Sequence, residues 1–224
     1  MKGNIRSGFL IVLSCFLLLG CTTNAATDTE QDETENQEQS EVEQEEQRDD
    51  ARVVTIEDKT FADEDFEFYT LMNQIKIALQ IDVAESEKEV TYWEEQRAYY
   101  ENVNVNLQSL IELYGMSLLA EEKNYFVPDE KLQDAVATYK ERVNHVTEAV
   151  RLIEEFGQEK YNRHIEEYIR QTMLRDRIAK ELEERIAEDN PEATEEEINY
   201  MVEQEFEELL MSHMATLEME IHLK

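Results

Sequence analysis

The sequence predicts a mostly α-helical body of about five helices, with a small two-stranded sheet that pairs its first and last segments. Residues 51–224 contain only two glycines, Gly115 and Gly157, and two prolines, Pro128 and Pro191. That is too few turn formers for an all-β, Rossmann or P-loop protein. Apolar residues also recur every three or four positions through most of this body, which is the spacing of an amphipathic helix.

The first 20 residues are typical of a secretory signal peptide. Lys2 and Arg6 precede an apolar run, residues 9–19, that is too short to span a bilayer stably. The run ends in Leu-Leu-Gly before Cys21, which resembles the lipobox of bacterial lipoproteins. This resemblance implies that Cys21 carries acyl chains such as palmitate and anchors the chain at the extracytoplasmic face of a bacterial membrane. An ordinary signal peptide with a coincidental cysteine is the alternative.

Residues 21–50 are predicted to form an acidic disordered tether. They hold 12 Asp and Glu, with Arg48 as the only base, and almost no apolar side chains. Such a segment cannot bury enough surface to offset its chain entropy. Residues 51–224 then remain as one helical domain, with 42 acidic residues against 18 basic ones.

The body begins with a predicted strand over residues 51–56, which are short and β-branched, and Glu57, Asp58 and Lys59 suit a turn after it. A helix is expected from the acidic turn at residues 63–65. Its apolar face comprises Phe66, Tyr69, Met72, Ile75 and Leu79. A weakly patterned stretch follows. Helical spacing then returns and predicts a helix that ends near Asn124. Its apolar positions are Leu107, Leu110, Ile111, Tyr114, Leu118 and Leu119.

Three further helices are expected. Pro128 followed by two acids predicts the start of a helix that runs to Gly157. The next helix extends from Tyr161 to Ile186, before Pro191. Thr194 and Glu197 form a capping box that opens the last helix.

The final segment, residues 217–223, alternates apolar and polar residues, which is the period of a half-buried strand. The strand at residues 53–56 is its only predicted partner.

These segments resemble the SurA and PrsA group of extracytoplasmic chaperones and foldases. The likeness lies in the strand, turn and acidic helix of residues 54–66, in the long helix and cap of residues 107–129, and in residues 157–186 with the closing strand. It covers roughly residues 51–224. The resemblance implies a SurA N-terminal-like helical chaperone lobe.

Family members that isomerise prolyl bonds carry an inserted, glycine-rich parvulin domain, and no such segment is present in this sequence. The expectation is therefore a membrane-anchored chaperone, or holdase, that binds unfolded or nascent secreted polypeptides without isomerase chemistry. The alternative is a structural or adaptor lipoprotein that binds one folded partner or self-associates. Client identity, oligomeric state and source organism stay open, as does holdase activity without an isomerase domain.

No catalytic residue, metal site or cofactor is predicted. The four histidines are far apart in sequence, and none pairs with another at the three- or four-residue spacing of helix metal ligands. Carboxylate pairs occur throughout so acidic a chain and single out no acid/base dyad. The negative charge also argues against nucleic acid as a partner, because phosphate binding requires clustered Lys and Arg.

Candidate client-binding residues are aromatic and methionine side chains. Trp93, Tyr99 and Tyr100 cluster where the core pattern is weak, so they are candidates for an exposed patch. Met211 and Met214 belong to a group of methionines near the C-terminus, and methionine adapts well to unrelated apolar sequences. Core packing of the same residues is the competing interpretation.

Overall fold

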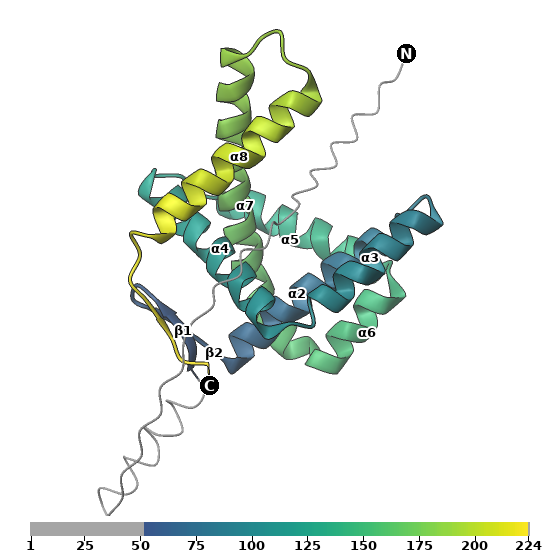
Figure 1. Ribbon diagram of the computed structural model, residues 1–224. Helices are drawn as coiled ribbons and strands as arrows, with labels where there is room; N and C mark the ends of the chain where they lie inside the picture. The colour runs from purple at the N-terminus through teal and green to yellow at the C-terminus, as the bar shows by residue number, and fades with distance from the viewer. Residues whose placement is uncertain (1–51, 224) are drawn as a thin grey trace, which may run out of the picture. The chain divides into compact units, whose positions relative to one another are not determined.

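A computed structural model describes residues 52–223, which form seven helices and three strands (Figure 1). The predicted signal peptide, Cys21 and the predicted tether lie outside the described residues. The prediction of a mostly helical body with a small sheet is confirmed.

The two ends of the body pair in an antiparallel sheet, as predicted. The sheet has the order β2-β1-β3 and consists of β1 (Arg52–Ile56), β2 (Lys59–Ala62) and β3 (Met219–Ile221). Val54 lies opposite Ile221 and Ile56 lies opposite Met219. Two further hydrogen bonds flank this ladder: His222 donates its backbone N–H to Val53 at 2.9 Å, and Glu57 donates to Glu218 at 2.8 Å.

Strand β2 was not predicted. The sequence predicts a turn at residues 57–59 and a sheet of only two strands. Glu57 and Asp58 make a two-residue hairpin turn, and Ile56 lies opposite Lys59. Glu57 adopts φ 50°, a conformation that Gly and Asn adopt most readily. Because an acidic pair occupies this turn, the sequence carries none of the usual hairpin signal.

Seven helices follow β2 in the described part of the chain. In chain order they are α2 (Asp63–Asp82), α3 (Glu87–Tyr99), α4 (Val103–Glu122), α5 (Asp129–Asn144), α6 (Thr147–Phe156), α7 (Gln158–Asp189) and α8 (Glu195–Met214). Side-chain caps start α3, α4 and α8. Three helix boundaries that the sequence predicts are confirmed, two helix ends and one helix start. Asn124 takes φ 62° after α4, Gly157 takes φ 107° after α6, and the Thr194–Glu197 capping box opens α8.

Two helices differ from the sequence prediction. Helix α3 was not expected, because it buries none of its side chains fully and so lacks an apolar stripe; a capping box between Ser86 and Glu89 starts it. The single helix expected from Pro128 to Gly157 is divided into α5 and α6. His145 ends α5, and Val146 has an extended backbone that starts α6.

The helices enclose two apolar clusters. The first lies among the sheet, α2, α4, α5, α6 and the first half of α7, and includes Phe68, Leu110 and Tyr161. The second lies among the end of α4, the second half of α7 and α8, and includes Ile178 and Val202. Helix α7 spans both clusters, and Figure 1 shows its second half packed beside α8. Its length therefore joins the two parts of the body.

Candidate functional site

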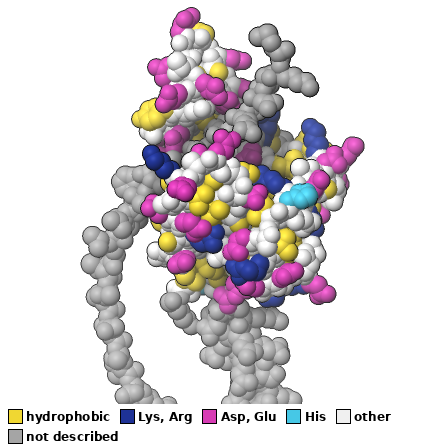
Figure 2. All heavy atoms as spheres, turned by 90° about the vertical axis from the view of Figure 1, so that its right-hand side faces the viewer, with side chains coloured by type: hydrophobic (Ala, Val, Ile, Leu, Met, Phe, Trp, Pro, Cys, Tyr) yellow, Lys and Arg dark blue, Asp and Glu magenta, His cyan; other side chains and the backbone are white. Residues whose placement is uncertain are grey.

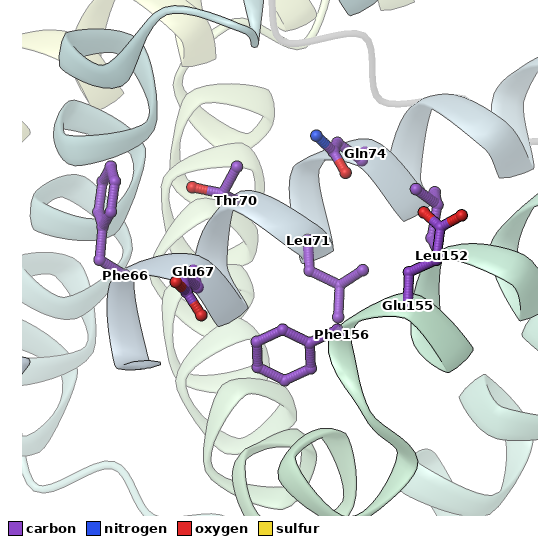
Figure 3. A pocket seen from close by; sticks show the side chains of 8 residues that line it. All are labelled: Phe66, Glu67, Thr70, Leu71, Gln74, Leu152, Glu155 and Phe156. Atoms are coloured by element: carbon purple, nitrogen blue, oxygen red, sulfur yellow. The ribbon is translucent and has the colours of Figure 1, made fainter. Parts of the chain in front are cut away.

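An open groove lies between α2 and α6 (Figure 3). Its volume is about 300 Å³, at the lower end of the range for small-molecule pockets. Leu71, which is 4% exposed, forms part of its wall. The lining residues are Phe66, Glu67, Thr70, Leu71 and Gln74 from α2, with Leu152, Glu155 and Phe156 from α6.

The groove is apolar inside and acidic at its rim. Phe66, Leu152 and Phe156 are half-buried and pack against the first core cluster, so part of each ring or aliphatic side chain stays open to solvent. Glu67 and Glu155 are exposed. Figure 3 shows the two phenylalanine rings on separate helices, Phe66 on α2 and Phe156 on α6, with the Leu71 side chain close to Phe156. This arrangement can take up apolar side chains and attract positive charge beside them.

One polar atom in the groove has no partner. The Thr70 hydroxyl oxygen is buried, and no hydrogen-bond partner for it lies in residues 52–223. A buried hydroxyl without a partner is destabilising.

A charged cluster fixes one end of α2 to the start of α7. Glu64 accepts hydrogen bonds from Arg163 at 2.7 Å and contacts the His164 ring nitrogen at 3.0 Å, and the Lys160 ammonium lies 3.4 Å away. Hydrogen bonding to His164 and Arg163 lowers the pKa of Glu64 to about 2. The cluster holds a permanently ionised carboxylate at neutral pH, so it stabilises the helix contact and offers no proton for catalysis.

The predicted aromatic residues form two pairs on α3, one in the middle of the helix and one at its C-terminal end. The Tyr92 and Trp93 rings meet edge to face with centroids 5.0 Å apart, and the Tyr99 and Tyr100 rings do so at 5.5 Å. Tyr92 is exposed, whereas Trp93, Tyr99 and Tyr100 are half-buried. Burial raises the pKa of the Tyr100 hydroxyl. These side chains form a partly open aromatic surface, and its role in binding stays a prediction.

The predicted methionines lie on α8 and differ from each other. Met211 is 72% exposed. Met214 is half-buried and packs against Gly115 of α4, where an added Cβ would lie 2.5 Å from the methionine sulfur. Met214 therefore fills space between two helices.

The structure does not bring the aromatic and methionine groups together. Helix α3 packs on α2, whereas α8 packs on α4 and α7, and Figure 1 shows α3 and α8 at opposite sides of the described body. Figure 2, which faces the side of α3 and α6, shows apolar side chains in separate patches among acidic ones. A single binding surface made from all five predicted residues is therefore not formed.

The α2–α6 groove was not predicted from the sequence. Leu152 and Phe156 are four residues apart, so they lie on the same side of α6. They are next to its buried stripe, which consists of Ala149 and Ile153. Apolar residues beside a complete core stripe are the signal that could have marked this surface.

Comparison of the chain with protein-family models, with curated proteins and with solved structures gave no match. In residues 52–223, no helix combines the length and the apolar character needed to cross a bilayer. Within the same residues, no group of three His, Cys, Asp or Glu side chains has the arrangement of a metal site.

Proposed function

We propose that this chain is a lipid-anchored extracytoplasmic holdase, which binds unfolded secreted polypeptides without chemical change to them. The α2–α6 groove is the observation that carries the proposal. It leaves two phenylalanine rings and a leucine partly open on a strongly acidic body. Binding of apolar segments requires only such a surface.

The acidic rim supports the same function. Carboxylates are spread over the face that Figure 2 shows, and they help to keep a protein with open apolar patches in solution and separate from its own copies. Clients with exposed apolar segments flanked by Lys or Arg fit the groove and its rim best, because opposite charges then face each other.

An aggregation assay tests the proposal directly. The unlipidated mature chain, residues 21–224 with Cys21→Ser, is added to two unrelated proteins diluted from denaturant, and their light scattering is followed. We expect protection of both proteins. Protection of neither, or tight binding of only one folded partner at fixed stoichiometry, would favour the structural or adaptor alternative.

Two matched substitutions locate the binding surface. Phe156→Gln removes a ring from the groove, whereas Phe126→Gln removes a ring that is 81% exposed and lies outside it. We expect Phe156→Gln to raise the concentration needed for half protection about tenfold, because burial of such a ring contributes about 1.5 kcal/mol or more. Phe126→Gln should change little. Equal losses in both variants would show that protection comes from exposed apolar side chains in general.

The aromatic and methionine residues give a separate comparison. Polar replacement of Trp93, Tyr99 and Met211 together should abolish protection, with helix content and melting temperature preserved, if those side chains also contact clients. Unfolding of the triple variant would instead identify them as core residues. Full protection by a folded triple variant would restrict client binding to the groove.

A further inference from the structure

Strand β3 has an open outer edge. Residues 218, 220 and 222 direct their backbone groups toward β1, as shown by the bonds from Glu57 to Glu218 and from His222 to Val53. Backbone groups alternate along a strand, so the N–H and C=O groups of Met219 and Ile221 point away from β1. No strand pairs with this edge in the part of the chain that the structure describes. The edge can therefore accept another strand.

The apolar face of the sheet extends onto this open edge. Ile56 and Val54 are 0% exposed, and their cross-strand partners Met219 and Ile221 are 42% and 59% exposed. Directly opposite residues share one face of an antiparallel sheet. Met219 and Ile221 therefore lie on the core-facing side of the sheet, but much of each side chain is exposed to solvent. Leu223 continues the same alternation and is 37% exposed.

The opposite face of β3 is acidic. Glu218 and Glu220 alternate with the apolar side chains, and Glu57 lies beside Glu218, whose N–H it accepts at 2.8 Å. Basic side chains also lie near the sheet: Arg52 begins β1, Lys59 lies on β2 with its ammonium over the Phe61 ring, and the mostly buried His222 ring lies 3.9 Å from the Glu220 carboxylate. An incoming strand at β3 therefore meets apolar side chains on one face and carboxylates on the other.

This charge pattern selects among possible occupants. A second β3 would place Glu218 and Glu220 of two copies side by side, and like charges on neighbouring strands are destabilising. The chain's own residues 21–50 carry 12 acids and one base, so they are repelled as well. Basic side chains, in contrast, would pair with both carboxylates.

We propose that β3 accepts an extended segment of another polypeptide as a fourth strand, and that the preferred segment alternates apolar and basic residues. Its apolar side chains cover Met219 and Ile221, its basic side chains face Glu218 and Glu220, and its backbone pairs with the outward groups of β3. This site is separate from the α2–α6 groove, so the proposal does not depend on the holdase function.

Binding of synthetic peptides to the unlipidated mature chain tests the proposal. The probes are a fluorescent seven-residue peptide of alternating Lys and Val, a peptide of the same composition with its lysines and valines in two blocks, and an alternating Glu and Val peptide. Fluorescence anisotropy at moderate salt measures their affinities. We expect the alternating Lys peptide to bind at least about tenfold more tightly than the other two. Equal binding of the alternating and block peptides would overturn the proposal, because it would show charge attraction alone.

Two substitutions in β3 test the geometry. Ile221→Pro removes an outward N–H and leaves the bonds between β1 and β3 in place, because proline is tolerated at a strand edge that faces solvent. It should weaken the alternating Lys peptide about tenfold, whereas Ile221→Val, which keeps the N–H, should not. Unchanged binding by a folded Ile221→Pro variant would contradict strand addition.

Charge reversal gives an independent result that does not involve the backbone. Glu218→Lys with Glu220→Lys alters two exposed side chains and should reverse the preference, so that the alternating Glu peptide binds more tightly than the Lys peptide. Retention of the original preference would place the basic peptide elsewhere on the acidic body and would overturn the assignment to β3. A normal melting curve for this variant is the control for folding.

Discussion

Gly157 joins α6 to α7 in a conformation that other residues rarely adopt. Its φ is 107°, its N–H donates to Ile153 at 2.9 Å, and its carbonyl accepts from Tyr161 at 3.0 Å. An added Cβ would meet only the Lys160 side chain, at 3.9 Å, so space is available and the cost of a side chain is conformational. The two hydrogen bonds hold the backbone in this conformation while one helix ends and the next begins.

Gly157→Ala should therefore destabilise the body by about 1–3 kcal/mol, which lowers Tm by several degrees in a thermal melt followed by circular dichroism. Gly115→Ala is the comparison. Gly115 lies within α4, where the backbone suits alanine. The new Cβ would lie 2.5 Å from the Met214 sulfur and 3.5 Å from Leu217 Cδ1, so any loss at Gly115 comes from a shift of the Met214 side chain and not from the backbone. A Tm for Gly157→Ala equal to that of the parent would refute the conformational argument.

The lowered pKa of Glu64 makes its contribution to stability dependent on pH. A carboxylate with a folded pKa of about 2 and an ordinary value of 4.5 stabilises the fold fully above pH 4.5 and loses this effect as the pH falls toward 2. The side chain is 34% exposed, so its ion pairs contribute no more than about 1 kcal/mol.

Glu64→Gln should accordingly lower Tm by no more than about 4 °C at pH 7, and the difference from the parent should vanish between pH 4.5 and pH 2. Thermal melts of both chains across this range measure the effect. Glu67→Gln is the matched control, since it removes the same charge from an exposed side chain of α2. A Glu64→Gln difference that stayed constant down to pH 2 would argue against the ion-pair cluster as its cause.

At the level of elements, the sequence predicted those helices that bury a continuous apolar stripe and have a local start or stop signal, such as an acidic first turn, a glycine or a capping box. Helices α2, α4, α7 and α8 belong to this group, and Gly157 and Thr194 mark their limits correctly. Helix α3 was missed because tertiary contact with α2 and a capping box stabilise it, with no buried stripe. Strand β2 was missed because its partner β1 and an unusual turn residue, Glu57, define it.

The candidate site was harder to predict than the fold. The sequence marks aromatic and methionine residues as candidates, but it does not show that Trp93 and Met211 lie on helices that pack against different neighbours. The α2–α6 groove depends on how two helices from distant parts of the chain meet, and local spacing carries no such information. The pairing of β1 with β3 was predictable only because both segments alternate and each needs a partner.

The closing strand contributes to stability through its pairing, since its own side chains are exposed. Removal of residues 217–224 breaks the bonds from His222 to Val53 and from Glu57 to Glu218, and it removes Leu217 from the first core cluster. We expect a Tm lower by several degrees for the whole body, because β1 then becomes an open edge above the core. Removal of residues 223–224 alone keeps these bonds and should have little effect. An unchanged melting curve for the longer deletion would show that the strand is dispensable.

The whole molecule combines three predicted parts, of which the first is positively charged and the other two are acidic. A positively charged start and apolar run precede Cys21, a strongly acidic segment follows, and the described body is acidic as well. The membrane attachment that we propose rests on acyl chains at Cys21, because segments with so many carboxylates are not attracted to an anionic membrane surface.

Cys21→Ala should therefore release the chain from membranes. One acyl chain gives only marginal, reversible attachment, whereas two or more give stable binding, and the lipobox resemblance implies acylation of this kind at Cys21. Fractionation of cells that express the parent and the variant measures the effect, and mass spectrometry of the N-terminal peptide identifies the modification. Cys15→Ala is the matched control, because Cys15 lies within the predicted signal peptide and its loss should leave anchoring intact. A Cys21→Ala chain that is still processed and still sediments with membranes after a high-salt wash would show that the interpretation as a lipobox is wrong.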